Sequence, residues 1–314
     1  MRILITGGAG FVGSNLVAHL ASTTTHDLVV LDNESLGSRS SIQSHRHSFI
    51  KGDILDATCL RQAMNGVDVV VHLAADTRVM DSIANPQHNF RNNVIGTFQL
   101  LDMARLMRTP RIVIASTGGA ILGNVTPPIH ERMMAQPLAP YGASKLAVEG
   151  YASAFAAAYN MSVVCLRFSN VYGPGSLHKG SVVAHFCKSL RVHDDLVVFG
   201  DGSQCRDFLY VGDLMLGIER IISSDAGGVF QLGSGAPTSV NELLDALRRI
   251  LGNKFASAIR YEPFRAGEVR DTWCDISKAR AMLGFEPETR LEDGLRQTWS
   301  WFERQSIEHH YQGA

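Results

Sequence analysis

The first thirteen residues constrain the fold more than any other part of the sequence. Residues 2–5 form an apolar run that is long enough for one buried strand. Gly7, Gly10 and Gly13 follow it, and residues 14–20 then have the pattern of a helix. A strand, a glycine turn and a helix N-terminus together make a phosphate site, because the helix end offers unpaired N–H groups and glycine lets the backbone approach a pyrophosphate closely.

A second apolar run, residues 28–31, ends in Asp32. This Asp lies nineteen residues after Gly13, close to the spacing of about 20 expected for the acid that holds an adenosine ribose. A carboxylate there accepts hydrogen bonds from both ribose hydroxyls and repels a 2′-phosphate. The sequence therefore predicts a dinucleotide site that favours NAD over NADP; the alternative is a plain glycine turn followed by a surface Asp.

Composition excludes several other classes of protein. The 314 residues carry a formal net charge of −1, which gives no reason to expect a nucleic-acid or membrane partner. The five cysteines are dispersed without a C-x-x-C pair, so no metal site or redox motif is predicted, and they suit a reducing cytoplasm. An apolar run from residue 2 leaves no room for a signal peptide, and no run approaches the roughly 18 residues of a membrane span. We expect a cytoplasmic protein.

Apolar runs alternate with helical patterns through residues 1–173. The expected strands are 2–5, 28–31, 49–51, 67–73, 111–115 and 163–168, and the main helices are 14–20, 56–65, 88–108 and 140–159. This alternation predicts an α/β fold with a Rossmann-type doubly wound parallel sheet in residues 1–173. Residues 174–314 are predicted to be mainly a smaller C-terminal substrate-binding lobe, with return segments to the sheet near 206–234.

Tyr141 and Lys145 are four residues apart on the helix expected from Pro140, so they share one face. A nearby cation favours the phenolate form of a tyrosine, and a phenolate near neutrality is a competent base toward a sugar hydroxyl. Taken alone, the pattern also fits a packed Tyr and a solvated Lys. The dinucleotide site and the Ser116-Thr117 pair at the end of the preceding strand favour the catalytic interpretation.

With these motifs the chain resembles the extended short-chain dehydrogenases/reductases of the nucleotide-sugar epimerase/dehydratase family, and within it the UDP-glucose 4-epimerases. The resemblance covers nearly the whole chain. Its further motifs are Asp32-Asn33, Gly52-Asp53-Ile54, His72-Leu-Ala-Ala75, Asn93 in Asn-Val-Ile-Gly-Thr, Arg167 to Pro174, Arg206-Asp207 and Arg265-Ala-Gly-Glu268. The implied activity is 4-epimerisation of a UDP-sugar through a 4-keto intermediate, with NAD as cofactor.

The resemblance also implies roles for individual residues. Asp53 and Ile54 would contact the adenine, and Ser116 or Thr117 would bind the sugar hydroxyl beside Tyr141, with Thr117 favoured. The residues expected to bind NAD are Gly7, Gly10, Phe11, Val12, Gly13, Asp32, Asn33, Asp53, Ile54, Leu73, Ala74, Ala75, Asn93, Ser116, Tyr141 and Lys145. The residues expected to bind the substrate are Arg78, Asn170, Arg206, Arg265, Glu268 and Thr272.

Departures from the family pattern bear on the reaction and the sugar. Gly118 and Gly119 follow Thr117, where dehydratases carry an acidic pair and decarboxylases a Glu, so both reactions are disfavoured. Thr272 stands where relatives restricted to unacetylated hexoses have a Tyr, so UDP-GlcNAc/UDP-GalNAc is expected as well as UDP-Glc/UDP-Gal. Uronate epimerases tend to have an Arg at the position of Met80. The absence of that Arg argues against UDP-glucuronate as the substrate, although Arg78 could substitute for it.

Relatives often dimerise through helices near 90–108 and 141–158, so we expect a homodimer.

Two alternatives to an epimerase stay open at this point. A nucleotide-sugar reductase or dehydrogenase with net redox change would need added NAD(P), whereas an epimerase would not. A non-catalytic dinucleotide-sensing protein usually loses the Tyr or the Lys, and both are present here.

Overall fold

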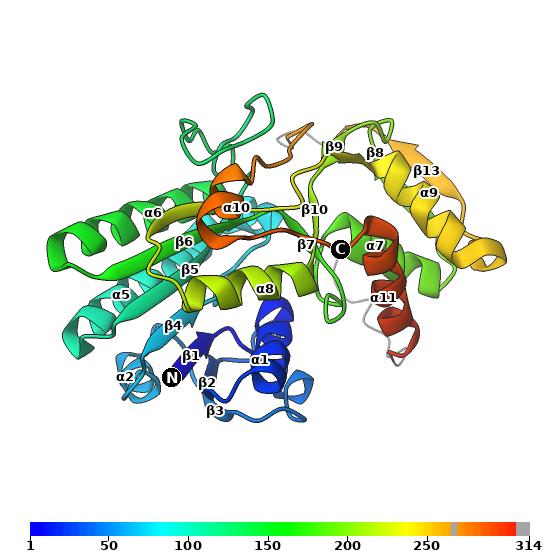
Figure 1. Ribbon diagram of the computed structural model, residues 1–314. Coiled ribbons are helices and arrows are strands. Elements are labelled where there is room, and N and C mark those ends of the chain that lie inside the picture. The colour runs from blue at the N-terminus through cyan, green and yellow to red at the C-terminus, as the bar shows by residue number, and fades with distance from the viewer. Residues whose placement is uncertain (265–268, 306–314) are drawn as a thin grey trace.

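A single parallel sheet organises the computed structural model, which describes residues 1–264 and 269–305. Within these residues seven strands lie in the order β11-β6-β5-β4-β1-β2-β3 (Figure 1). Their bounds are β1 (Arg2–Thr6), β2 (Asp27–Asp32), β3 (Ser48–Lys51), β4 (Val69–His72), β5 (Arg111–Thr117), β6 (Ser162–Phe168) and β11 (Gly228–Leu232). The order reverses between β1 and β4, which confirms the predicted doubly wound Rossmann-type fold.

Helices cover both faces of this sheet. One face carries α1 (Phe11–Thr23), α8 (Val211–Ile222) and α10 (Ser277–Leu283), and the other carries α2 (Ala57–Ala63), α5 (Gly96–Met107) and α6 (Pro140–Tyr159). Each face has its own apolar core. Because the sheet is covered on both sides, a strand such as β2 is apolar at successive positions rather than at alternate ones.

A smaller body stands beside the sheet, at the right of Figure 1. Its core is enclosed by α7 (Val182–Arg191), α9 (Val240–Leu251) and α11 (Leu291–Glu303), next to the parallel pair β8 (Leu196–Phe199) and β13 (Ile259–Glu262). Both β11 and α10 come from the C-terminal half of the chain but pack on the large sheet. The exact division of the chain into two domains stays a prediction.

Short elements connect these layers. They are η1 (Arg39–Ser41), α3 (Val79–Ala84), α4 (Pro86–Phe90), η2 (Arg91–Ile95), β7 (Asn170–Tyr172), β9 (Cys205–Arg206), β10 (Phe208–Tyr210), β12 (Thr238–Ser239) and η3 (Gly252–Lys254). The segment η2 is a π-helical turn, so the helix expected over 88–108 is divided there. The turn lies where Asn93 bonds to the backbone of Asp76, in the loop after β4.

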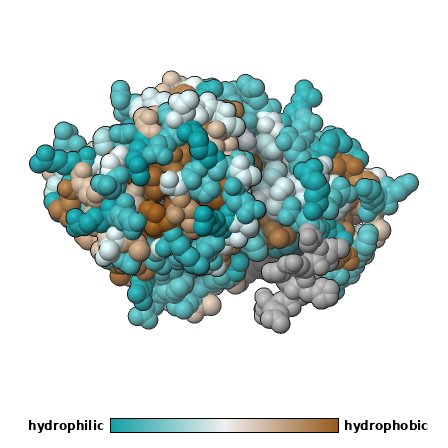
Figure 2. Space-filling model, turned by 90° about the horizontal axis from the view of Figure 1, so that it is seen from below, coloured by the Kyte–Doolittle hydropathy of each residue, from teal (hydrophilic) through white to brown (hydrophobic). Residues whose placement is uncertain are grey.

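The outer surface is mixed in character. The face shown in Figure 2 is largely hydrophilic, with apolar residues gathered in patches. Across the described residues, every helix is too short or too polar to cross a bilayer.

Candidate active site

The glycine turn between β1 and α1 is packed so closely that side chains are excluded from it. Gly7 has a φ of +70°, and a Cβ there would lie 2.7 Å from the backbone nitrogen of Ala74. A Cβ at Gly13 would lie 2.2 Å from the carbonyl oxygen of Gly7. Gly10 precedes α1 and gives it no side-chain cap, so the first N–H groups of the helix can serve an anion.

Asp32 is held at the end of β2 beside this turn. Its Oδ2 accepts a hydrogen bond from the N–H of Ala9 (2.9 Å), and its Oδ1 accepts one from the N–H of Glu34 (2.7 Å). Burial raises the pKa of this carboxyl group, while the two backbone hydrogen bonds act in the opposite direction. The carboxylate is therefore fixed in place next to the phosphate turn, as a ribose-binding acid would have to be.

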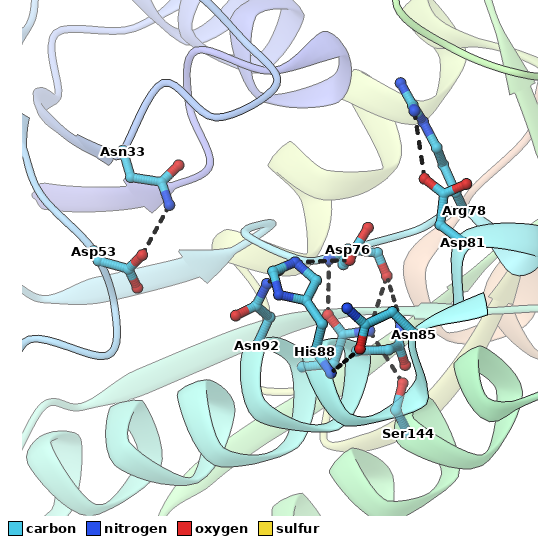
Figure 3. A network of polar contacts seen from close by, with 11 residues as sticks. Asn33, Asp53, Asp76, Arg78, Asp81, Asn85, His88, Asn92 and Ser144 are labelled. Atoms are coloured by element: carbon cyan, nitrogen blue, oxygen red, sulfur yellow. Dashed lines mark hydrogen bonds and ion pairs between the residues drawn. The ribbon is translucent and has the colours of Figure 1, made fainter. Parts of the chain in front are cut away.

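The residues expected around the adenine lie at the neighbouring strand ends. Asn33 Nδ2 donates to Asp53 Oδ2 over 2.8 Å (Figure 3). Ile54 has a buried side chain that packs against Gly96, so it faces the core of α5 rather than solvent.

At the end of β4 the chain is bonded back to β1. The N–H groups of Leu73 and Ala74 donate to the carbonyl oxygen and the hydroxyl of Thr6, and Ala75 follows. His72 lies between the hydroxyls of Thr6 (2.7 Å) and Thr97 (2.9 Å). Burial lowers the pKa of His72 to about 3, so it is a neutral core residue.

Asn93 joins this loop to the helix that carries Tyr141. Its Oδ1 accepts from the N–H of Asp76 (2.7 Å), and its Nδ2 donates to the carbonyl of Asp76 (2.8 Å) and to Ser144 Oγ (3.1 Å). Ser144 in turn donates to the carbonyl of Tyr141 (2.8 Å). Figure 3 shows Ser144 and Asp76 on either side of this link.

Tyr141, Lys145 and Thr117 come together where β5 ends against the first turns of α6. Tyr141 is 8% exposed, and its burial raises the pKa of the phenol to about 12, while a hydrogen bond with Thr117 acts in the opposite direction. Lys145 Nζ donates to the carbonyl of Ala115 (3.0 Å), and burial lowers its pKa to about 8. A phenol, a hydroxyl and an ammonium thus occupy one buried corner at a strand end.

Ser116, next to Thr117, has a different partner. Its Oγ donates to Glu149 Oε1 over 2.6 Å, and Glu149 also receives two hydrogen bonds from Arg167, at 2.9 Å from Nε and 2.8 Å from Nη2. The Arg167 and Glu149 side chains are only 5% and 7% exposed. Glu149 was not predicted from the sequence, although its place four residues after Lys145 on the same helix was a usable signal.

The expected substrate residues are spread over several segments. The N–H of Asn170 donates to the carbonyl of Asp207 (2.9 Å), and Arg206 Nη1 donates to the carbonyls of Cys205 and Arg270. Arg206 also pairs with Thr272 in a parallel bridge. Arg265 and Glu268 lie outside the described residues.

Thr272 and Arg78 lie on two further segments. A Cβ at Gly119 would lie 3.0 Å from Thr272 Oγ1, so the Thr272 side chain lies close to the chain just after Thr117, at the end of β5. Arg78 forms an ion pair with Asp81 (3.4 Å, Figure 3), and its Nη2 donates to the carbonyl of His178 (3.3 Å).

The same sequence pattern occurs in known proteins. Residues 3–233 match the model of the NAD dependent epimerase/dehydratase family. The chain is 36% identical to a putative UDP-glucose 4-epimerase of Methanocaldococcus jannaschii, covering 95% of this chain and 97% of the relative.

Two solved structures have closely similar folds. The UDP-glucose 4-epimerase of Thermotoga maritima, solved with UDP-glucose, superposes with a TM-score of 0.91 at 34% identity and covers 96% of this chain and 98% of that one. The UDP-glucuronic acid 4-epimerase of Bacillus cereus, solved with UDP-glucuronic acid and NAD, gives a TM-score of 0.90 at 29% identity over 97% and 99% of the two chains.

Proposed function

The chain belongs to the NAD-dependent epimerase/dehydratase family, and from this premise we propose that it is an NAD-dependent 4-epimerase of a UDP-hexose. The substrate pair is UDP-Glc/UDP-Gal or UDP-GlcNAc/UDP-GalNAc. The observation that carries the proposal is the buried corner in which Tyr141 bonds to Thr117 and shares a helix face with Lys145. The names of the relatives and solved structures support a nucleotide-sugar 4-epimerase of this kind.

The residues around the glycine turn fit NAD. At Gly7 and Gly13 a Cβ would collide with neighbouring backbone, so glycine is required for this tight turn; the uncapped start of α1 suits a pyrophosphate, and Asp32 suits the ribose diol. When bound, oxidised NAD supplies a hydride acceptor and a positive charge that lowers the pKa of Tyr141. This influence would oppose that of burial, which raises the pKa of the phenol to about 12.

Tyr141 and Lys145 have separate roles in the proton transfer. Tyr141 takes the proton of the sugar 4-hydroxyl and returns it after the 4-keto sugar has turned over in the pocket. Lys145, buried and held by the carbonyl of Ala115, supplies a fixed positive charge on the face of the helix that carries Tyr141. Because the sugar is oxidised and then reduced within one cycle, the reaction needs no net supply of oxidant.

We assign the hydroxyl beside Tyr141 to Thr117 rather than Ser116. Thr117 is the hydrogen-bond partner of Tyr141, whereas Ser116 already donates its proton to the Glu149 carboxylate. Ser116 is also 5% exposed, which leaves little surface for a sugar. Its proposed role is to fix the end of β5 on α6.

The reaction type follows from what surrounds Thr117. Gly118 and Gly119 bring no acid or base to the strand end, which fits epimerisation and does not fit elimination. Thr272 approaches Gly119 with a small side chain, and this supports a pocket that accepts an N-acetyl group as well as a hydroxyl.

A homodimer is proposed from the exposed faces of α5 and α6. Phe98 on α5 is 40% exposed, and Tyr151 and Tyr159 on α6 are 42% and 51% exposed. Phe98 and Tyr151 form an edge-on pair with ring centroids 5.3 Å apart, so the apolar surface spans both helices. Aromatic surface of this kind is typical of a protein–protein contact.

The proposal is tested by NMR of the purified protein with UDP-Glc, UDP-GlcNAc and UDP-GlcA in separate samples without added cofactor. A new C4 epimer from UDP-Glc or UDP-GlcNAc is the expected result and names the sugar. Turnover of UDP-GlcA alone would replace the UDP-hexose with a uronate. Turnover only with a stoichiometric supply of NAD or NADH would instead indicate a dehydrogenase or reductase.

A further inference from the structure

Three cationic side chains gather where the connection between β7 and α7 crosses the first turn of α1. Lys179 lies in this connection, Arg78 directly precedes α3, and Lys188 is on α7. Arg78 Nη2 donates to the carbonyl of His178 (3.3 Å), and Lys188 Nζ donates to the carbonyl of Lys179 (3.1 Å). The carbonyl groups of His178 and Lys179 thus hold the side chains of Arg78 and Lys188 next to Lys179. The proton transfer proposed above uses none of these three side chains.

The connection holds Lys179 in a defined place. Ser176 Oγ donates to the carbonyl of Gly173 (2.7 Å), and the N–H of Lys179 donates to the carbonyl of Ser176 (3.0 Å). From α1, Asn15 Nδ2 donates to the carbonyl of Pro174 (2.9 Å). Lys179 is therefore fixed against the helix that begins at the glycine turn.

The side chain of Lys179 is half-buried, and its ammonium lies over an aromatic ring. Its Nζ lies 5.3 Å from the ring centroid of Phe11, the first residue of α1, which follows Gly10. Burial lowers the pKa of Lys179 to about 8. Burial also lowers the pKa of Lys188, and the positive charge of Arg78 lowers it further, so these two cations lie close enough to repel each other.

Within the described residues, this group carries more positive than negative charge. Among residues 1–264 and 269–305, Arg78 forms an ion pair with Asp81, whereas neither Lys179 nor Lys188 pairs with a carboxylate. Three positive charges thus face one negative charge. Taking an unpaired ammonium out of water is costly, which favours an anion as its partner.

We propose that Lys179, with Arg78 and Lys188 beside it, binds the oxygens of a diphosphate. The proposal rests on the proposed function, which brings two diphosphates to this end of the sheet: that of NAD and that of the sugar nucleotide. The contact with Phe11 joins Lys179 to the glycine turn, and the bonds from Arg78 to the His178 carbonyl and from Lys188 to the Lys179 carbonyl join this connection to the start of α3 and to α7. A diphosphate offers charge-assisted hydrogen bonds to several donors at once and matches the excess of positive charge.

The test is a comparison of nucleotide affinities by isothermal titration calorimetry. Lys179→Met removes the charge and keeps most of the aliphatic stem; Lys179→Gln is carried in parallel, so that the test stands if one variant does not fold. The matched control is Lys254→Met, which removes a surface lysine paired with Glu303 far along the chain. UDP, dTDP and GDP are first titrated into the wild type, and the tightest of them is used with NAD on every variant.

We expect Lys179→Met and Lys179→Gln to bind one of the two ligands at least tenfold more weakly than the wild type, while Lys254→Met binds both as the wild type does. Weaker binding of the nucleoside diphosphate assigns Lys179 to the sugar nucleotide. Weaker binding of NAD assigns it to the cofactor. Unchanged affinity for both ligands in a folded variant overturns the proposal.

Discussion

The buried pair of Glu149 and Arg167 gives the sharpest prediction about stability. The change is Glu149→Gln, which keeps the shape of the side chain and removes its charge. Glu149 accepts three hydrogen bonds, from Ser116 Oγ and from two nitrogens of Arg167. An amide can accept at only one of its two ends, so at least one of these donors would face an NH₂ group, and Arg167 would stay charged without a carboxylate.

The size of the effect follows from how deeply the pair is buried. With the side chains only 5% and 7% exposed, solvent screens the pair poorly. Breaking such a pair from one side costs about 3–5 kcal/mol. At roughly 2–4 °C per kcal/mol for a large domain, we expect the Tm to fall by about 10 °C.

Differential scanning calorimetry of three variants makes the comparison. Glu303→Gln is the matched control, because Glu303 pairs with Lys254 at the surface and its loss should cost no more than about 1 kcal/mol. The double change Glu149→Met with Arg167→Met should recover most of the loss, since an apolar pair leaves no buried charge. A Tm for Glu149→Gln within 2 °C of the wild type (a margin set by the roughly 2–4 °C per kcal/mol above) would refute the reasoning.

Five further substitutions test the site. Tyr141→Phe should abolish turnover and leave NAD binding intact, because only the proton-transferring hydroxyl is lost; residual turnover above about 1% of the wild-type rate would remove Tyr141 as the base. Thr117→Ala should lower kcat about 100-fold, whereas Ser116→Ala should act mainly on the Tm; the reverse ranking would exchange their roles. Asp32→Ala should narrow the preference for NAD over NADP, measured as the ratio of the two dissociation constants; an unchanged ratio would argue against Asp32 as the ribose acid. Gly13→Ala should prevent NAD binding, because its Cβ would lie 2.2 Å from the carbonyl of Gly7; normal NAD content after gel filtration would contradict this.

The pH dependence of turnover gives a further prediction. Burial lowers the pKa of Lys145 to about 8, while the charge of Glu149 acts in the opposite direction. Turnover should therefore decline as the pH rises through about 8, where Lys145 loses its proton. In Glu149→Gln the decline should begin at a lower pH, because the raising influence of the carboxylate is gone. A profile that stays flat to pH 10 would show that the charge of Lys145 is not needed.

Local sequence patterns were sufficient for the fold. The glycine turn, Asp32 and the regular alternation of strands and helices depend on neighbours close in the chain, so they could be predicted residue by residue. The Tyr141 and Lys145 pair could be placed for the same reason, because a helix repeats every 3.6 residues. The roles of the predicted site residues stay predictions.

Contacts between distant segments could not be predicted. The bond from Ser116 to Glu149 spans 33 residues, and the bond from Arg78 to His178 spans 100. Such contacts depend on how strands and loops meet in space, which no local period encodes. The π-helical turn was also missed, and it lies where Asn93 bonds to the loop after β4.

The central claim is that the C4 hydrogen leaves the sugar and returns to it inside the protein. The most direct measurement is NMR of the product formed from UDP-glucose, or from UDP-GlcNAc if that is the sugar turned over, deuterated at C4 in ordinary water. The account predicts a C4 epimer that retains its deuterium. Replacement of the C4 deuterium by hydrogen from water would contradict it, because the hydrogen would then have left as a proton rather than as a hydride held within the site.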